Sequence, residues 1–121
     1  MDRLARTQVL QWACFEQTNV DGVISRARFR RLFPDVIPTR PEEFVTWWRD
    51  GSRALQVLDA HLETRDYLVG GAFSIADIAL FAYVHCAPEG GFDMSGYRAL
   101  GRWLERITQR PSHIPIDVVP G

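Results

Sequence analysis

The feature that most constrains the fold is an apolar run that follows a helix-start signal. Ser74 is a preferred N-cap residue, and Asp77 stands three positions later, where its carboxylate can accept a hydrogen bond from the amide of the cap. Beyond this signal the residues from Ile75 to Val84 are apolar on every side of the expected helix. A helix of this kind in a soluble protein has to be central and surrounded by others. We therefore expect a buried central helix over residues 75–87.

Helical periodicity extends over much of the remaining chain, with apolar residues spaced by threes and fours. The first such pattern covers residues 3–33, but Asn19, Asp21 and Gly22 interrupt it. Either one long helix bends there, or two helices meet at a turn, because Gly and Asn both weaken a helix interior.

Two further helices carry start signals of their own. Thr39 and Glu42 match a capping box that opens a helix running to Thr64. Asp93 can cap a last helix, which Pro111 ends. No alternating pattern is long enough to build a sheet, and no internal repeat is found. The predicted fold class is all-α, an irregular bundle of about four to six helices around the central helix.

Composition and charge exclude several classes of function. The chain has 121 residues and a formal net charge of −1, which is ordinary for a globular domain. Its one basic cluster comprises Arg26, Arg28, Arg30 and Arg31. With this net charge we expect those arginines to be solvated or paired with acids rather than to bind nucleic acid. No stretch has the length of a membrane span, and the first residues lack the apolar run of a signal peptide, so we expect a cytoplasmic protein without membrane contact.

Metal and nucleophile chemistry is not indicated. Cys14 and Cys86 are far apart and have no histidine at metal-ligand spacing, so both are expected to be buried and inert. His61, His85 and His113 lie on different helices or on the tail, with no paired Ser or Cys nucleophile in sequence. His61 is expected to pack or cap near a helix end. We predict no catalytic residue and no metal site in this chain.

Three segments in this order resemble the C-terminal domain of bacterial cytosolic glutathione transferases. They are His61-Leu62, Tyr67-Leu-Val-Gly70 and the cap Ser74-Ile-Ala-Asp77. The resemblance also covers Gln8–Trp12 with Phe15–Gln17, the stretch Glu89–Asp93, and Trp103-Leu104 with Pro111, so that nearly the whole chain, 1–121, is identified as this one domain. In that family the capping box opens the buried central helix and is important for folding.

The resemblance implies where a small electrophilic substrate would bind. The helical domain of this family supplies one wall of the electrophile pocket and a share of the dimer interface. On this chain Gln8, Trp12 and Phe15 lie on one helical face and are the candidate substrate-binding residues, although Trp12 and Phe15 could equally be core. Asp2 is a further candidate, for reaching a glutathione amine across a dimer.

The thioredoxin-like N-terminal domain of a complete family member is absent from this sequence. That domain holds glutathione, the co-substrate of the complete protein, and activates its sulfur. The chain alone is therefore expected to bind no cofactor, and its own status as an enzyme stays open. It is either an excised domain or a naturally short product.

Two functions remain after these exclusions. The first is the helical half of a homodimeric glutathione transferase in detoxification, inactive alone and completed by the missing thioredoxin-like domain. The second is a freestanding protein-interaction module of the same fold, as in some translation factors, and an exposed apolar patch would be its mark. The retained pocket face of Gln8, Trp12 and Phe15 favours the first.

The capping assignment makes one quantitative prediction. Asp77→Ala should remove an N-terminal cap worth on the order of 1 kcal/mol and lower the melting temperature without affecting the pocket.

Overall fold

The N-terminal periodic segment folds as one continuous helix in a computed structural model, which describes residues 3–110. The helix begins as α1 (Arg3–Phe15), continues as the π-helical segment η1 (Glu16–Ser25) and ends as α2 (Arg26–Leu32). Phe15 and Arg26, at the two junctions, both have right-handed helical dihedral angles. Of the two alternatives left by the sequence, the single helix is therefore the one that forms, and it accommodates Asn19, Asp21 and Gly22 by widening its turns.

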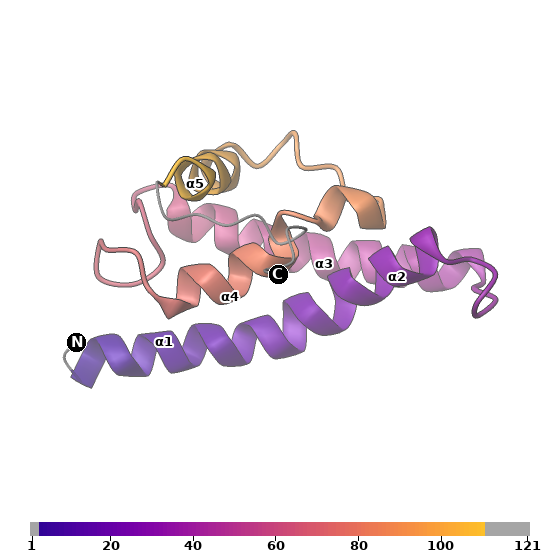
Figure 1. Ribbon diagram of the computed structural model, residues 1–121, viewed down its shortest axis with the longest axis horizontal. Helices are drawn as coiled ribbons and strands as arrows, with labels where there is room; N and C mark the ends of the chain where they lie inside the picture. The colour runs from indigo at the N-terminus through magenta and orange to yellow at the C-terminus, as the bar shows by residue number, and fades with distance from the viewer. Residues whose placement is uncertain (1–2, 111–121) are drawn as a thin grey trace, which may run out of the picture.

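The other elements are α3 (Pro41–Leu62), α4 (Ile75–Val84), the short 3-10 helix η2 (Ala87–Gly90) and α5 (Arg98–Thr108). The first three pack against the long helix, whereas α5 packs on α3. Figure 1 shows α4 lying between α1 on one side and α5 on the other. Within residues 3–110 no β-strand forms, and none of the helices has the length and apolar character needed to cross a membrane. The all-α bundle predicted from the sequence is confirmed.

The core surrounds the inner face of α4. Leu80 and Val84 of this helix are completely buried, and so are Leu55, Leu58 and Trp103 on the helices that surround it. The first turns of α4 are less enclosed than the sequence predicted, because Ile75 and Ile78 are 67% and 55% exposed.

Asp77 connects three separate parts of the chain at the start of α4. The amide of Ser74 donates to its Oδ2 atom at 2.9 Å, and the two residues form the capping box. Its Oδ1 atom accepts two more hydrogen bonds, from the Leu68 amide at 3.1 Å and from Trp103 Nε1 at 2.8 Å. The carboxylate has no exposed surface. Asp77 is thus a buried hub and not only a helix cap.

The two other predicted caps are wrong. Helix α3 begins after Arg40 with Pro41 in its first turn, and no side chain caps it, because the Thr39 hydroxyl accepts a hydrogen bond from Arg30 instead. Asp93 binds the amide and hydroxyl of Ser95 in the loop before α5.

The first turn of α5 is instead capped from another helix. Asp59 of α3 accepts a hydrogen bond from the Leu100 amide at 2.9 Å. Helix α5 thereby departs from the sequence expectation, because a cap from a distant helix leaves no local pattern in the sequence.

The hub raises the expected cost of losing Asp77. Asp77→Ala leaves two buried donors, the Leu68 amide and Trp103 Nε1, and the half-buried Ser74 amide without an acceptor. We therefore expect the free energy of unfolding to fall by about 3–5 kcal/mol, rather than by about the 1 kcal/mol of a cap alone. Urea denaturation measures the change. Asp66→Ala is the control: this carboxylate is 75% exposed and pairs with Arg106 at 3.6 Å, so its loss should cost under about 1 kcal/mol. A loss near 1 kcal/mol for Asp77→Ala would contradict the hub.

Candidate functional site

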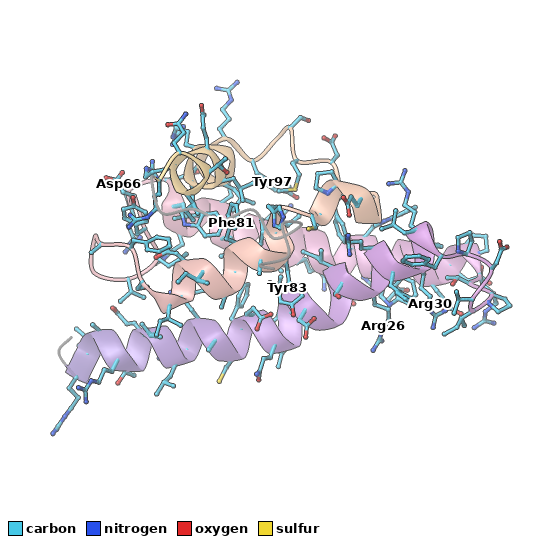
Figure 2. All side chains as sticks on the ribbon, in the orientation of Figure 1. Arg26, Arg30, Asp66, Phe81, Tyr83 and Tyr97 are labelled. Atoms are coloured by element: carbon cyan, nitrogen blue, oxygen red, sulfur yellow. The ribbon has the colours of Figure 1, made fainter. Side chains whose placement is uncertain are left out.

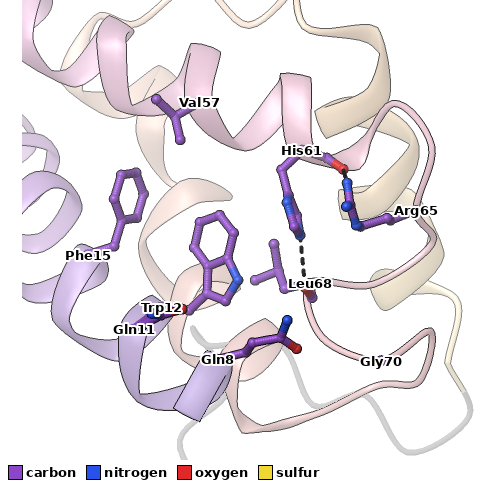
Figure 3. Close-up of a pocket in the computed structure, with 9 residues that line it drawn as sticks. All are labelled: Gln8, Gln11, Trp12, Phe15, Val57, His61, Arg65, Leu68 and Gly70. Carbon is purple, nitrogen blue, oxygen red and sulfur yellow. Dashed lines mark hydrogen bonds between the residues drawn. The ribbon is translucent and has the colours of Figure 1, made fainter. Parts of the chain in front are cut away.

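A pocket of about 330 Å³ opens between α1 and the C-terminal end of α3. Figure 3 shows side chains of the two helices facing one another across it, with the loop that follows α3 closing one end. The volume falls at the lower end of the range of small-molecule sites. Nine residues line it: Gln8, Gln11, Trp12, Phe15, Val57, His61, Arg65, Leu68 and Gly70.

All three residues of the predicted pocket face lie on this pocket. Trp12 and Phe15 meet edge to face, with ring centroids 5.4 Å apart, and Gln8 lies one turn before Trp12. Trp12 and Phe15 also pack against the buried core with part of their surface. Packing in the core and lining the pocket therefore do not exclude one another for these two aromatics. Their role in binding a substrate stays a prediction.

His61 joins the two walls of the pocket. Its ring lies 4.8 Å from that of Trp12, and its Nε2 atom is 2.8 Å from the carbonyl oxygen of Leu68. Because a carbonyl oxygen can only accept, Nε2 carries the proton and Nδ1 is left as the second polar atom of the ring. The prediction that His61 packs near a helix end did not include this pocket position, since the contact depends on how α1 and α3 cross.

The pocket has a polar rim. Arg65 donates to the carbonyl oxygen of His61 at 3.1 Å and is exposed, and the amides of Gln8 and Gln11 stand on the opposite helix. Sequence reasoning missed both Gln11 and Arg65. The site therefore combines an aromatic floor with one cation and two amides at its edge, which suits a flat apolar molecule that carries a polar group.

A second hollow of about 260 Å³ continues along the same groove. Phe15 and Val57 line both hollows and separate them. The second is more polar, because Asp50 and Arg53 of α3 and Thr18 and Asn19 of η1 form its sides.

His85 and Cys86 are neighbours at the C-terminal end of α4, where the Cys86 Sγ atom lies 3.3 Å from the His85 Nε2 atom. His85 stacks on Phe81 with ring centroids 4.9 Å apart, and its Nδ1 atom is 2.8 Å from the Phe81 carbonyl oxygen. Cys14 is exposed and Cys86 half-buried, so the expectation that both are buried is wrong: their positions on the helices, not residue type, decide their exposure. His113 and Asp2 lie outside the described residues. Within those residues no group of three or more His, Cys, Asp or Glu side chains could hold a metal ion.

The basic cluster is engaged in ion pairs and hydrogen bonds within the fold. Arg28 pairs with Glu89, Arg30 lies 3.9 Å from Glu43, and Arg31 donates to the carbonyl oxygen of Pro88. Arg26 is exposed. Figure 2 shows Arg26 and Arg30 along α2.

A buried carboxylate, Glu16, lies at the start of η1, directly after the pocket residue Phe15. Glu16 follows Phe15 and is only 8% exposed, and its pKa is raised by burial and by the neighbouring charge of Asp21. Asp21 also raises the pKa of Tyr83 on α4, where burial, the charge of Glu16 and a side-chain hydrogen bond to Asp21 add to the effect. In the loop before α5, hydrogen bonds from Ser95 lower the pKa of Asp93.

The fold and the pocket define the class of this chain: an all-helical domain built on a buried capped helix, with an aromatic groove between its first two long helices. Residues 49–111 match the profile of the glutathione S-transferase C-terminal domain. The chain belongs to this family.

Similar proteins agree with this assignment. A glutathione S-transferase from Pseudomonas fluorescens is 44% identical, with a TM-score of 0.89 over 94% of this chain and 57% of that one. The disulfide-bond oxidoreductase YfcG of Escherichia coli is 30% identical over 108 residues, covering 88% of this chain and 49% of that protein. A sphingomonad glutathione S-transferase solved with glutathione is 31% identical, with a TM-score of 0.74 over 89% of this chain and 50% of that one. The chain spans about half the length of the curated relatives it matches.

The buried carboxylate of Glu16 predicts an unusual pH dependence of stability. Its folded-state pKa lies above its ordinary value of 4.5, so the charged form is disfavoured in the folded state and stability is lost as the pH rises through that range. Glu16→Gln, which carries no charge, should therefore raise the free energy of unfolding at pH 7.

The pH dependence of the stability gained by Glu16→Gln shows whether the gain comes from removing a buried charge. The advantage of Glu16→Gln should fade as the pH falls below about 4.5, where Glu16 is protonated in both states. The melting temperatures of wild type and Glu16→Gln between pH 4 and pH 7 measure this change in stability. Glu63→Gln is the control, because Glu63 is exposed. A gain of the same size at every pH would argue against the raised pKa.

Proposed function

We propose that this chain is the helical half of a glutathione transferase and that the pocket between α1 and α3 forms one wall of its electrophile site. The observation that carries the proposal is the convergence of Trp12, Phe15 and His61 on one cavity in a domain of this family. Glutathione is the co-substrate of the complete protein, and this chain is inactive by itself.

The pocket residues contribute binding rather than chemistry. The reaction forms a bond between the glutathione sulfur and a carbon of the electrophile, whose leaving group departs with the electron pair. The residues that bind glutathione and ionise its thiol belong to the thioredoxin-like half. The aromatic floor holds the electrophile against the attacking sulfur, and such positioning converts a bimolecular step into an effectively unimolecular one.

The polar rim supports a preference among electrophiles. Arg65 is the one cation among the residues that line the pocket, and Gln8 and Gln11 add amide donors. A nitro, carbonyl or carboxylate group on the electrophile could accept hydrogen bonds from them.

We propose that the complete protein is a homodimer and that this domain contributes part of the dimer interface.

Trp12→Ala should reveal the pocket's role in the complete protein. Removing the indole should raise KM for an aromatic electrophile by about tenfold, as expected for a large apolar contact, and leave KM for glutathione unchanged. Steady-state kinetics with each substrate varied in turn measures the two effects. Leu10→Ala is the matched control, because Leu10 lies on the same helix and is 66% exposed outside the pocket. Equal changes in both KM values would argue against an electrophile wall.

The length of the native polypeptide is the first measurement to make. Mass spectrometry of the protein captured from its source cells should find a product about twice as long as this chain, in keeping with the relatives. A product that matches the 13.8 kDa of this sequence would overturn the transferase proposal.

One observation favours the second candidate function, a protein-interaction module. A group of large apolar side chains around the end of α2 is 43–61% exposed: Phe29, Leu32, Phe33, Val36 and Ile37. The rings of Phe29 and Phe33 are 5.2 Å apart. If the native product has the length of this chain, Phe33→Ser should abolish capture of a partner while leaving the melting temperature within about 2 °C.

A further inference from the structure

One side of α3 lines both the pocket and the second hollow. Arg53, Val57 and His61 follow one another at intervals of four residues and therefore share a face of this helix. His61 lines the pocket, Arg53 lines the second hollow, and Val57 lines both. Phe15, on the opposite wall, also lines both spaces. The two spaces therefore adjoin at Phe15 and Val57.

The second hollow lies at a distance from the rings of the pocket. Figure 3 shows Phe15 and Val57 at the opposite end of the pocket from Arg65, so the second hollow continues away from Arg65. Arg53 and His61 are eight residues apart on α3, which places them about 12 Å apart along the helix axis. A ligand that contacts the rings of the pocket has to be elongated to reach Arg53.

Arg53 is a cation that the fold leaves without a partner. Its side chain is exposed on the second hollow and forms no hydrogen bond or ion pair within residues 3–110. The acid that lines the same hollow, Asp50, is paired with Arg49, whose Nε atom lies 3.2 Å from its Oδ1 atom. The uncompensated charge that the second hollow presents to a ligand is therefore positive.

Asn19 adds a neutral donor from the η1 wall of the second hollow. Its Nδ2 atom donates to the hydroxyl of Thr18 at 2.8 Å, and this hydroxyl donates to the carbonyl oxygen of Cys14 at 2.9 Å. A side-chain amide has two N–H donors, so the second one of Asn19 remains for a ligand. A guanidinium group together with an amide donor suits the two oxygens of a carboxylate.

We propose that the pocket and the second hollow bind one elongated ligand, with a flat apolar group against Trp12 and a carboxylate at Arg53. Phe15 and Val57 contact the apolar chain that joins the two groups. The inference deepens the proposed function and rests on it for the ligand's role as the electrophile. The substrate class is then an aromatic electrophile that carries a carboxylate at the far end of an extended chain, and Arg53 determines specificity without taking part in the chemistry.

NMR titration of this chain with unreactive phenylalkanoates tests the site. ω-Phenyloctanoate should shift the indole N–H of Trp12 and the side-chain amide of Asn19, because it extends over both spaces. ω-Phenylbutanoate is too short to reach the second hollow and should shift the indole of Trp12 alone. No shift at Asn19 with the longer acid, or equal shifts there with both acids, would overturn the proposal.

Matched variants locate the carboxylate of the ligand. Arg53→Gln is expected to fold, because the side chain is exposed and has no partner within residues 3–110. It should weaken binding of ω-phenyloctanoate by about five- to tenfold and leave binding of ω-phenylbutanoate unchanged. Arg102→Gln removes an exposed charge from α5 and should affect neither acid. Equal losses in Arg53→Gln and Arg102→Gln, or a loss in Arg65→Gln alone, would contradict a carboxylate at Arg53.

Ligands of the same length with other end groups test the sign of the charge. ω-Phenyloctanamide should bind wild type about five- to tenfold more weakly than the acid, and Arg53→Gln should not weaken it further. ω-Phenyloctylamine should bind no more tightly than the amide. Tighter binding of the amine than of the acid would show that Asp50 selects a cation and would overturn the proposal.

Kinetics of the complete protein separate this inference from the proposed function. With glutathione, N-(chloronitrobenzoyl)aminohexanoate should have a lower KM than its primary amide, and Arg53→Gln should abolish the difference. Equal KM values for acid and amide in wild type would overturn this inference and leave the proposed function intact. Binding of ω-phenyloctanoate at both spaces without conjugation of either electrophile would overturn the proposed function and support the elongated site.

Discussion

The buried carboxylate of Asp77 is the interaction on which the rest of this domain depends. It joins the loop after α3, the start of α4 and the middle of α5 by hydrogen bonds. A carboxylate can serve this purpose because it has two oxygens and about four acceptor positions, whereas an amide or hydroxyl has fewer. The charge is tolerated without solvent because several donors, rather than a cation, compensate it.

The same carboxylate supports the candidate pocket through a short chain of contacts. Asp77 holds the amide of Leu68, the carbonyl oxygen of Leu68 meets His61, and the ring of His61 lies against Trp12. The expectation that a change at Asp77 would leave the pocket untouched is therefore inconsistent with the contacts. The loop that contains Leu68 is bound by Asp77 and also lines the pocket. A substitution that removes the Asp77 carboxylate should therefore also loosen this wall of the pocket.

Sequence reasoning succeeded where the signal is local. The pair Ser74 and Asp77 is three residues apart, and Gln8, Trp12 and Phe15 repeat with the helical period, so adjacent positions suffice to predict a cap and a face. It failed where two distant segments meet. The bond from Trp103 to Asp77, the cap that Asp59 gives α5, and the α3 side of the pocket at Val57 and His61 all depend on how helices cross. No pattern within one helix records such a crossing.

The π-helical segment also affects how this chain can change in length. A π turn is equivalent to one extra residue in an α-helix, so η1 shifts the phase of everything that follows it. Helix α1 can then face α3 with Trp12 while α2 turns Ala27 into the core. Deletion of one residue between Glu16 and Ser25 would rotate the faces of α1 and α2 by roughly 100° relative to one another. An insertion or deletion that looks minor in an alignment would in this segment exchange a buried face for an exposed one.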